Sequence, residues 1–266
     1  PYLTEYDESL SGDSYIDPIG TLIIWSAFGR NVFNGRVNSV SNDVRNYTLN
    51  LFHHHLLRRL VTDDAVRLGD ALLHQYRNKD ALGFKQACLL LLENLFTFSM
   101  LRHDQMPDVH TGGVLGLSKA RQRWTQSGGK PQLVFTHGSE GQVLVRQLGL
   151  GVSGRYKSPL MQIGFFDDLY QYHIPRFQAR WVDAENFIHS TLELACLERE
   201  LFPFLKAQLS KLSHKGTIDF SDVPVRLTEA YVAAFRSPKS VGAYARDFWL
   251  VQTGLDSGAA GAIFQV

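Results

Sequence analysis

The spacing of apolar and polar residues along the chain predicts mainly helices. From Asn42 onward, apolar side chains recur at about 100° per residue, which places them on one side of a helix. Asp and Asn residues precede several of these segments and can cap them. The expected helices include a short buried one after Pro18 and longer ones over residues 42–61, 62–76, 80–102, 183–216, 227–235 and 241–251. Asp183 is the expected cap of the helix over 183–216, and Pro203 is its expected kink.

Residues 119–157 follow a different pattern. Short apolar runs at 133–135 and 143–145 are separated by glycine and serine, which indicates short strands among short helices. We therefore predict a mainly α-helical protein, with helical N- and C-terminal parts around a mixed, winged-helix-like middle region. The expected divisions are a helical domain over 1–113, a mixed basic region over 114–182 and a helical region over 183–266. The chain has no initiator Met and stops in an apolar stretch, so we expect a truncated fragment of a longer protein.

Composition narrows the class of protein. With 266 residues, 44% of them apolar, the chain can bury a sizeable core, and 27 Lys and Arg against 26 Asp and Glu exclude a uniformly basic or acidic molecule. Cys88 and Cys196 both lie in apolar runs, which favours buried free thiols in a reducing compartment. The polar, acidic N-terminal residues do not resemble a signal peptide. We therefore expect a cytoplasmic protein.

Residues 85–102 are apolar enough to raise the question of a membrane helix. The run is interrupted by polar residues and is shorter than the roughly 20 residues that a bilayer needs. A buried core helix without membrane contact is the expectation.

Residues 149–154 match the G-x-G-x-x-G pattern of dinucleotide-binding loops. That site needs a helix after the third glycine, but Pro159 lies where the helix would run. Arg155 and Tyr156 also displace Lys157 from the place of a phosphate-loop lysine. We expect an exposed loop that presents these three side chains, and no nucleotide site.

Three consecutive histidines, His53 to His55, raise the question of a metal. Successive helical residues point about 100° apart, so the three side chains cannot meet at one ion. We expect His55 to pack on the apolar side of its helix, with His53 and His54 toward the edges of that side.

The pair His103–Asp104 resembles the central pair of the HD-superfamily phosphohydrolases, which are helical enzymes. The resemblance implies a metal ion that activates water. Its implied ligands are His54 or His55, then His103 and Asp104, then Asp108 or Asp167. Because the pair follows a predicted helix end, we expect a loop pair without metal. The chain has no other strong catalytic pattern, which favours a non-catalytic protein with no cofactor and no metal site.

Positive charge is concentrated in residues 119–157, which hold seven Lys and Arg against Glu140 alone. Such an excess is typical of a surface that contacts phosphates, and neighbouring aromatic rings could stack on bases. The alternative is a surface that pairs with the acidic N-terminal segment or with an acidic partner. The expected nucleic-acid-binding residues are Lys119, Arg121, Arg123, Trp124, Lys130, Arg146, Arg155, Tyr156 and Lys157.

Three short stretches, at 17–20, 31–36 and 44–47, follow one another near the N-terminus. Together they resemble the N-terminal region of uncharacterised bacterial proteins often encoded beside restriction and phage-defence genes. The resemblance covers about the first sixty residues and implies antiviral defence without a particular chemistry.

We therefore predict a non-catalytic nucleic-acid-binding and assembly subunit of a bacterial defence complex, with other protein subunits as partners. A protein-interaction scaffold and a metal-dependent HD-like phosphohydrolase are the alternatives.

Overall fold

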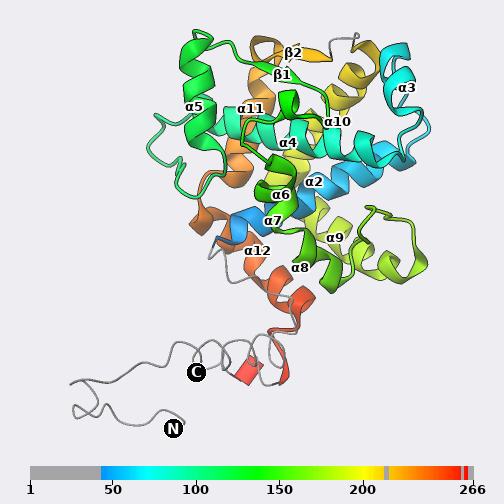
Figure 1. Cartoon of the computed structure of the whole chain (residues 1–266). Coiled ribbons are helices and arrows are strands. Elements are labelled where there is room, and N and C mark those ends of the chain that lie inside the picture. Colours follow the sequence, from blue (N-terminus) through cyan, green and yellow to red (C-terminus); the bar gives the residue numbers. More distant parts are fainter. Residues whose placement is uncertain (1–42, 213–215, 259–260, 263–266) are drawn as a thin grey trace, which may run out of the picture.

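The described part of the chain is built mainly from helices, as expected (Figure 1). The computed structural model describes residues 43–212, 216–258 and 261–262, so the helix expected after Pro18 lies outside it. The helices are α2 (Val44–Thr62), α3 (Asp70–Tyr76), α4 (Leu82–Arg102), α5 (Leu117–Gln126), α6 (Gln147–Leu150), α7 (Val152–Arg155), α8 (Lys157–Ile163), α9 (Gln178–Ser190), α10 (Leu192–Lys211), α11 (Val225–Phe235) and α12 (Pro238–Thr253).

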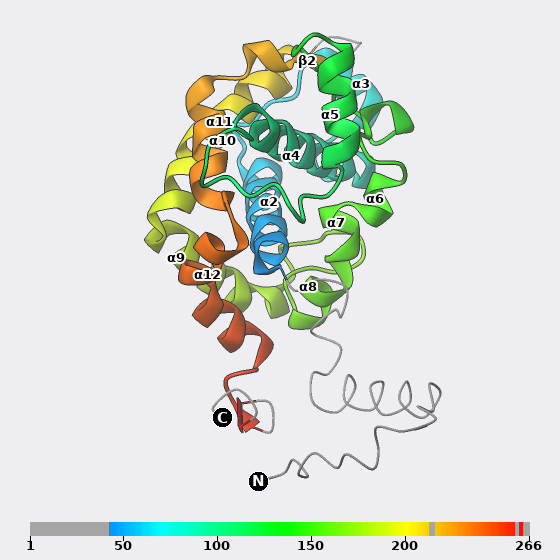
Figure 2. The same cartoon turned by 90° about the vertical axis from the view of Figure 1, so that its left-hand side faces the viewer.

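Helices α2 and α4 form the centre of the molecule. Figure 2 shows them in the middle, with α9–α12 on one side and α5–α8 on the other. All residues from 87 to 101 on α4 and from 48 to 57 on α2 are buried. One continuous core joins their apolar side chains to those of the outer helices, and each fully buried Leu or Phe contributes about 1.5–3 kcal/mol. None of the described helices is long and apolar enough to cross a membrane.

Two of the predicted helices, those over 62–76 and 183–216, have other bounds in the structure. The second helix begins at Asp70 rather than Thr62, because the Asp63 side chain accepts a hydrogen bond from the Ala65 amide and closes a separate turn. The Gly69 amide then donates to the Leu209 carbonyl of α10 at 2.9 Å. The chain between α2 and α3 is therefore bound to α10 and does not form a helix.

The helix expected over 183–216 is two helices. α9 begins at Gln178, so Asp183 lies inside it and does not cap it. Thr191 has extended backbone angles and separates α9 from α10. The Thr191 hydroxyl donates to the Phe187 carbonyl at 2.8 Å and holds the break. Pro203 lies inside α10 without ending it.

The middle region contributes one short strand. β1 (Gln132–Val134) pairs antiparallel with β2 (Thr217–Asp219), with Leu133 opposite Ile218. The second strand expected near 143–148 is wrong, since α6 begins there. Because β1 finds its partner after α10 and not in a neighbouring hairpin, the winged-helix-like feature is not confirmed within the described residues.

The two cysteines differ in exposure. Cys88 is buried on α4, and burial raises the pKa of its thiol. Cys196 is only half-buried on α10, so the expectation of burial is wrong there. Its sulfur accepts a hydrogen bond from the exposed Arg199 side chain at 3.0 Å, which shows that this side of α10 meets solvent.

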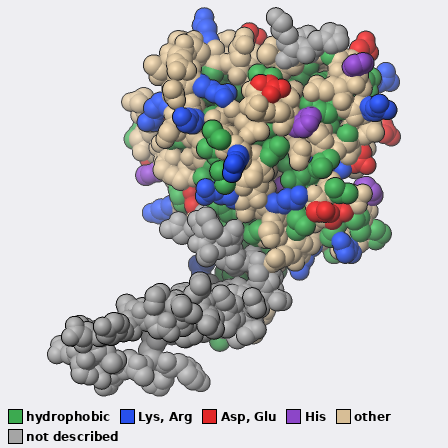
Figure 3. All heavy atoms as spheres, viewed as in Figure 1, with side chains coloured by type: hydrophobic (Ala, Val, Ile, Leu, Met, Phe, Trp, Pro, Cys, Tyr) green, Lys and Arg blue, Asp and Glu red, His purple; other side chains and the backbone are tan. Residues whose placement is uncertain are grey.

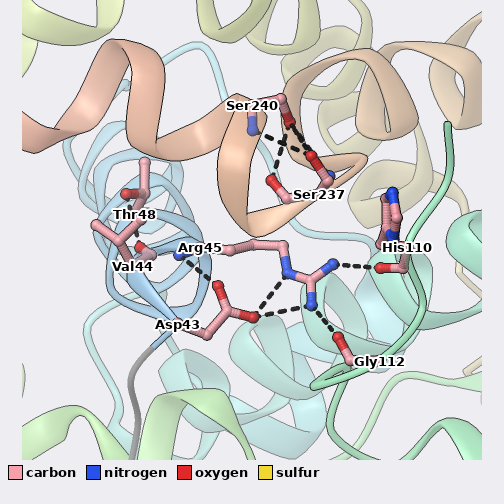
Figure 4. Close-up of polar contacts among 8 residues, drawn as sticks. All are labelled: Asp43, Val44, Arg45, Thr48, His110, Gly112, Ser237 and Ser240. Carbon is pink, nitrogen blue, oxygen red and sulfur yellow. Dashed lines mark hydrogen bonds and ion pairs between the residues drawn. The ribbon is translucent and has the colours of Figure 1, made fainter.

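A fully buried arginine fixes the start of α2 (Figure 4). Asp43 caps the helix through the Arg45 amide at 2.9 Å, and its other oxygen holds the Arg45 guanidinium, also at 2.9 Å. The guanidinium donates in addition to the carbonyls of His110 and Gly112 in the loop after α4. The pair therefore ties the first turn of α2 to that loop.

Replacing Arg45 with Met should destabilise the protein by about 3–5 kcal/mol, because the buried Asp43 carboxylate loses its counter-ion and two carbonyls lose their donor. Urea denaturation measures the loss. Arg67→Met, at an exposed arginine, is the matched control and should change stability by less than about 0.5 kcal/mol. A loss below about 1 kcal/mol in Arg45→Met would contradict this account of the pair.

Candidate functional site

The basic segment is centred on α5, which stands at one edge of the molecule (Figure 1). The helix carries three cations and no anion, and Ala120 is its one buried residue. Lys119 and Arg121 are exposed, while Arg123 is half-buried and donates to the Gln142 carbonyl at 2.6 Å. That bond places the loop containing the exposed Arg146 beside α5. Figure 3 shows separate Lys and Arg side chains over this part of the surface.

The other predicted contacts are less available to a ligand. Tyr156 is buried, and its ring packs edge-on to Tyr47 with centroids 4.6 Å apart. Trp124 is half-buried against Phe98 and Phe220. The expectation of an exposed loop that presents Arg155, Tyr156 and Lys157 is wrong, because this segment forms the short helices α6, α7 and α8 and the Tyr156 ring is buried.

Two of the cations have partners within the chain. Arg121 forms an ion pair with Asp104 at 3.1 Å. The Lys157 ammonium donates to the Asp168 carbonyl at 2.6 Å, and partial burial lowers its pKa. Lys130 is exposed beyond the end of α5, and Arg155 is half-buried on α7. The cations most open to an external phosphate are thus Lys119, Lys130 and Arg146.

The glycine-rich segment 149–154 already binds a side chain of the chain itself. The Glu93 carboxylate, buried on α4, accepts from the Ser153 amide at 2.6 Å and from the Gln147 side chain at 3.0 Å. A Cβ at Gly151 would lie 2.3 Å from a Glu93 oxygen, so this glycine makes room for the carboxylate. Burial raises the Glu93 pKa. The G-x-G-x-x-G pattern therefore serves internal packing.

His103 and Asp104 lie just after α4, as expected for a loop pair. His103 contacts the Thr228 hydroxyl at 3.1 Å, while Asp104 pairs with Arg121. Partial burial and the neighbouring Arg102 lower the His103 pKa. Neither side chain belongs to the one metal-type cluster found among the described residues, so the HD-like arrangement is not assembled there.

The three histidines of α2 are all buried, so the expectation that His53 and His54 lie toward the edges is wrong. His53 contacts the Tyr231 hydroxyl of α11 at 3.3 Å. His54 contacts the hydroxyl of Tyr172, in the segment between α8 and α9, at 2.7 Å. Burial lowers the pKa of His53 to about 3 and that of His54 well below its usual value, so both are neutral at pH 7.

His55 belongs to a cluster that joins three helices. Its Nε2 lies 2.8 Å from Oε1 of Glu198 on α10, and Nε2 of His189 on α9 lies 3.2 Å from the other oxygen. The three ligand atoms lie within 4.8 Å of one another, and no other such set of His, Cys, Asp or Glu occurs in the described ranges. His55 is fully buried, whereas the His189 side chain is 60% exposed. The cluster therefore connects the core to solvent.

Arg59 completes the surroundings of Glu198. Its guanidinium contacts the carboxylate and lies 4.0 Å from the Phe202 ring centroid. Burial alone would raise the Glu198 pKa, but the hydrogen bonds and charges of His55 and Arg59 lower it to about 2. The carboxylate is thus ionised at neutral pH. A surface pocket of about 320 Å³ opens beside it, lined in part by Arg59, His189 and Arg199.

Sequence reasoning missed this cluster because of the break at Thr191. On one straight helix, residues nine apart are rotated by about 180°, so His189 and Glu198 would face opposite ways. The extended Thr191 turns α10 back and brings both toward α2. The histidine run was visible in the sequence, but its partners depended on an irregular residue.

Comparisons with protein-family models, curated proteins and solved structures found no match to this chain. Function can therefore be inferred only from the chain's own features, above all the surface of α5 and the cluster of His55, His189 and Glu198.

Replacing Gly151 with Ala should destabilise the protein by about 2 kcal/mol or more, because the new methyl group meets the Glu93 carboxylate and a backbone carbonyl closer than 3 Å. Gly149→Ala is the matched control, since its Cβ would meet nothing within 4 Å and the residue lies in α6. Thermal or urea unfolding compares the two. Equal stability of both variants would show that the nearby Glu93 carboxylate does not require a glycine at position 151.

Proposed function

We propose that this protein binds nucleic acid through the exposed face of α5 and the neighbouring loop at Arg146. The observation that carries the proposal is α5 itself, a surface helix with three cations, no anion and one buried residue. Between residues 117 and 155, Glu140 is the one acidic residue. Arg121 is paired with Asp104, but neither Lys119 nor Arg146 forms an ion pair in the described part of the chain. Such exposed cations attract phosphates, and the exposed Gln122 side chain can donate to them.

The surface favours the phosphates of a duplex over the bases of a single strand. Proteins that hold single strands stack bases on exposed aromatic rings. Here Trp124 and Tyr156 pack inward, and the exposed face of α5 carries Ser, Thr, Gln, Lys and Arg. Binding should therefore be independent of sequence and sensitive to salt.

The proposal is tested by reversing the charge of Lys119 and Arg146, two exposed cations on the segments that the hydrogen bond from Arg123 to the Gln142 carbonyl joins. Lys119→Glu with Arg146→Glu should weaken binding to a short DNA duplex at least tenfold at low salt, measured by fluorescence anisotropy. Because two phosphate contacts are lost, the slope of log affinity against log salt should fall by about two.

The matched control reverses two exposed cations elsewhere, Arg226 on α11 and Lys239 on α12. It carries the same change in net charge, and acidic residues in the first helical turn do not disturb a fold. The control should retain most of the binding. Equal weakening by both variants, or no binding by the unaltered protein, would contradict the proposal and favour the interaction scaffold.

A defence role and partner subunits are separate expectations. Of the three stretches that resemble defence-associated proteins, 44–47 lies in the described residues, where it forms the first turn of α2, and the other two lie outside. The duplex-binding test does not depend on either expectation.

A further inference from the structure

We propose that His55, His189 and Glu198 form a binding site for a zinc ion. Two imidazole nitrogens and one carboxylate oxygen are a donor set that zinc accepts in a tetrahedral site with one open position. The site lies among α2, α9 and α10, on the opposite side of the molecule from α5 (Figure 2). It is therefore independent of the proposed nucleic-acid surface.

The distances suit an ion of this size. With zinc–ligand bonds of about 2.1 Å, tetrahedral ligand atoms lie about 3.4 Å apart. The observed separations are 2.8 Å from His55 to one Glu198 oxygen and 3.2 Å from His189 to the other, about 0.6 and 0.2 Å shorter than that value, so small side-chain shifts would admit the ion. His189 lies at the exposed end of α9, next to the break at Thr191, and its side chain can adjust.

The carboxylate of Glu198 already contacts both histidines. Its Oε1 lies 2.8 Å from Nε2 of His55 and its Oε2 lies 3.2 Å from Nε2 of His189, so the three donor groups face one another. Zinc would take the Nε2 lone pair of His55, so the ring proton would lie on Nδ1, and because Nδ1 is buried without a partner among the described residues, this N–H would weaken zinc binding. Arg59 would keep its contact with the carboxylate and hold Glu198 in place, as outer-shell partners do in zinc sites.

The fourth position would face the pocket. His189 and Glu198 line that pocket together with Arg59 and Arg199, so a water or an anion bound to the metal would lie beside two guanidinium groups. Closed structural zinc sites use four protein ligands, whereas an open position is typical of sites that bind or activate a small molecule. The geometry thus points to an accessible zinc ion that would take an anionic ligand.

Zinc binding to chelator-treated protein tests the proposal, with a chromophoric chelator as competitor. The unaltered chain should bind one zinc per molecule, and saturation should raise its melting temperature by about 5 °C or more. His189→Ala should weaken binding by more than the roughly 10–100-fold that loss of an outer-shell partner costs. Because the His189 side chain is 60% exposed, this variant should keep the fold.

The control is His74→Ala, at an exposed histidine of α3 outside the cluster. It should bind zinc as the unaltered protein does. Co²⁺ in place of zinc should give the visible absorption of a tetrahedral site, and His189→Ala should abolish it. If the unaltered chain binds zinc no more tightly than His189→Ala, the proposal is wrong, and the cluster is an ion-pair network that joins three helices.

Discussion

The central constraint on this fold is that α2 and α4 have almost no side that faces solvent. A buried polar group on these helices is stabilised by a partner within the protein, since an unpaired buried donor or acceptor costs about 1–3 kcal/mol. Both polar atoms of the Asn50 side chain on α2 have no hydrogen-bond partner among the described residues, whereas three titratable side chains have one. Arg45 meets Asp43 and loop carbonyls, Glu93 meets the glycine-rich turn, and His55 meets Glu198. Each bond leads to a different outer element, so the polar contacts of the two central helices position the rest of the molecule.

The run of three histidines shows how this works on one helix. Successive side chains point about 100° apart, so His53, His54 and His55 leave α2 in three directions. They meet α11, the segment around Tyr172 and α10 in turn. The rotation that prevents the three from sharing one ion also lets this short part of α2 contact three different segments of the chain.

The sequence predicted those parts of the fold that depend on local pattern. α2, α4, α11 and α12 were expected close to their observed bounds, because a cap or an apolar period marks each of them. The pairing of β1 with β2 and the break at Thr191 were not expected, since both depend on contacts that are distant along the chain or on a single irregular residue. The cations of α5 were found from composition alone, whereas His189 and Glu198 came together only through that break.

The short sheet has a consequence for the order of folding. β1 and β2 are three residues each, and their hydrogen bonds close a loop of about 80 residues, which costs roughly 4 kcal/mol of chain entropy. A two-stranded sheet of this size is not stable alone, so its strands can pair only after α11 has packed on α4 and α10 on α11, which brings the two ends together. α5 packs directly on α4 and precedes β1, so the late pairing of the strands would fix the segment that follows α5, while the basic surface itself depends on α4.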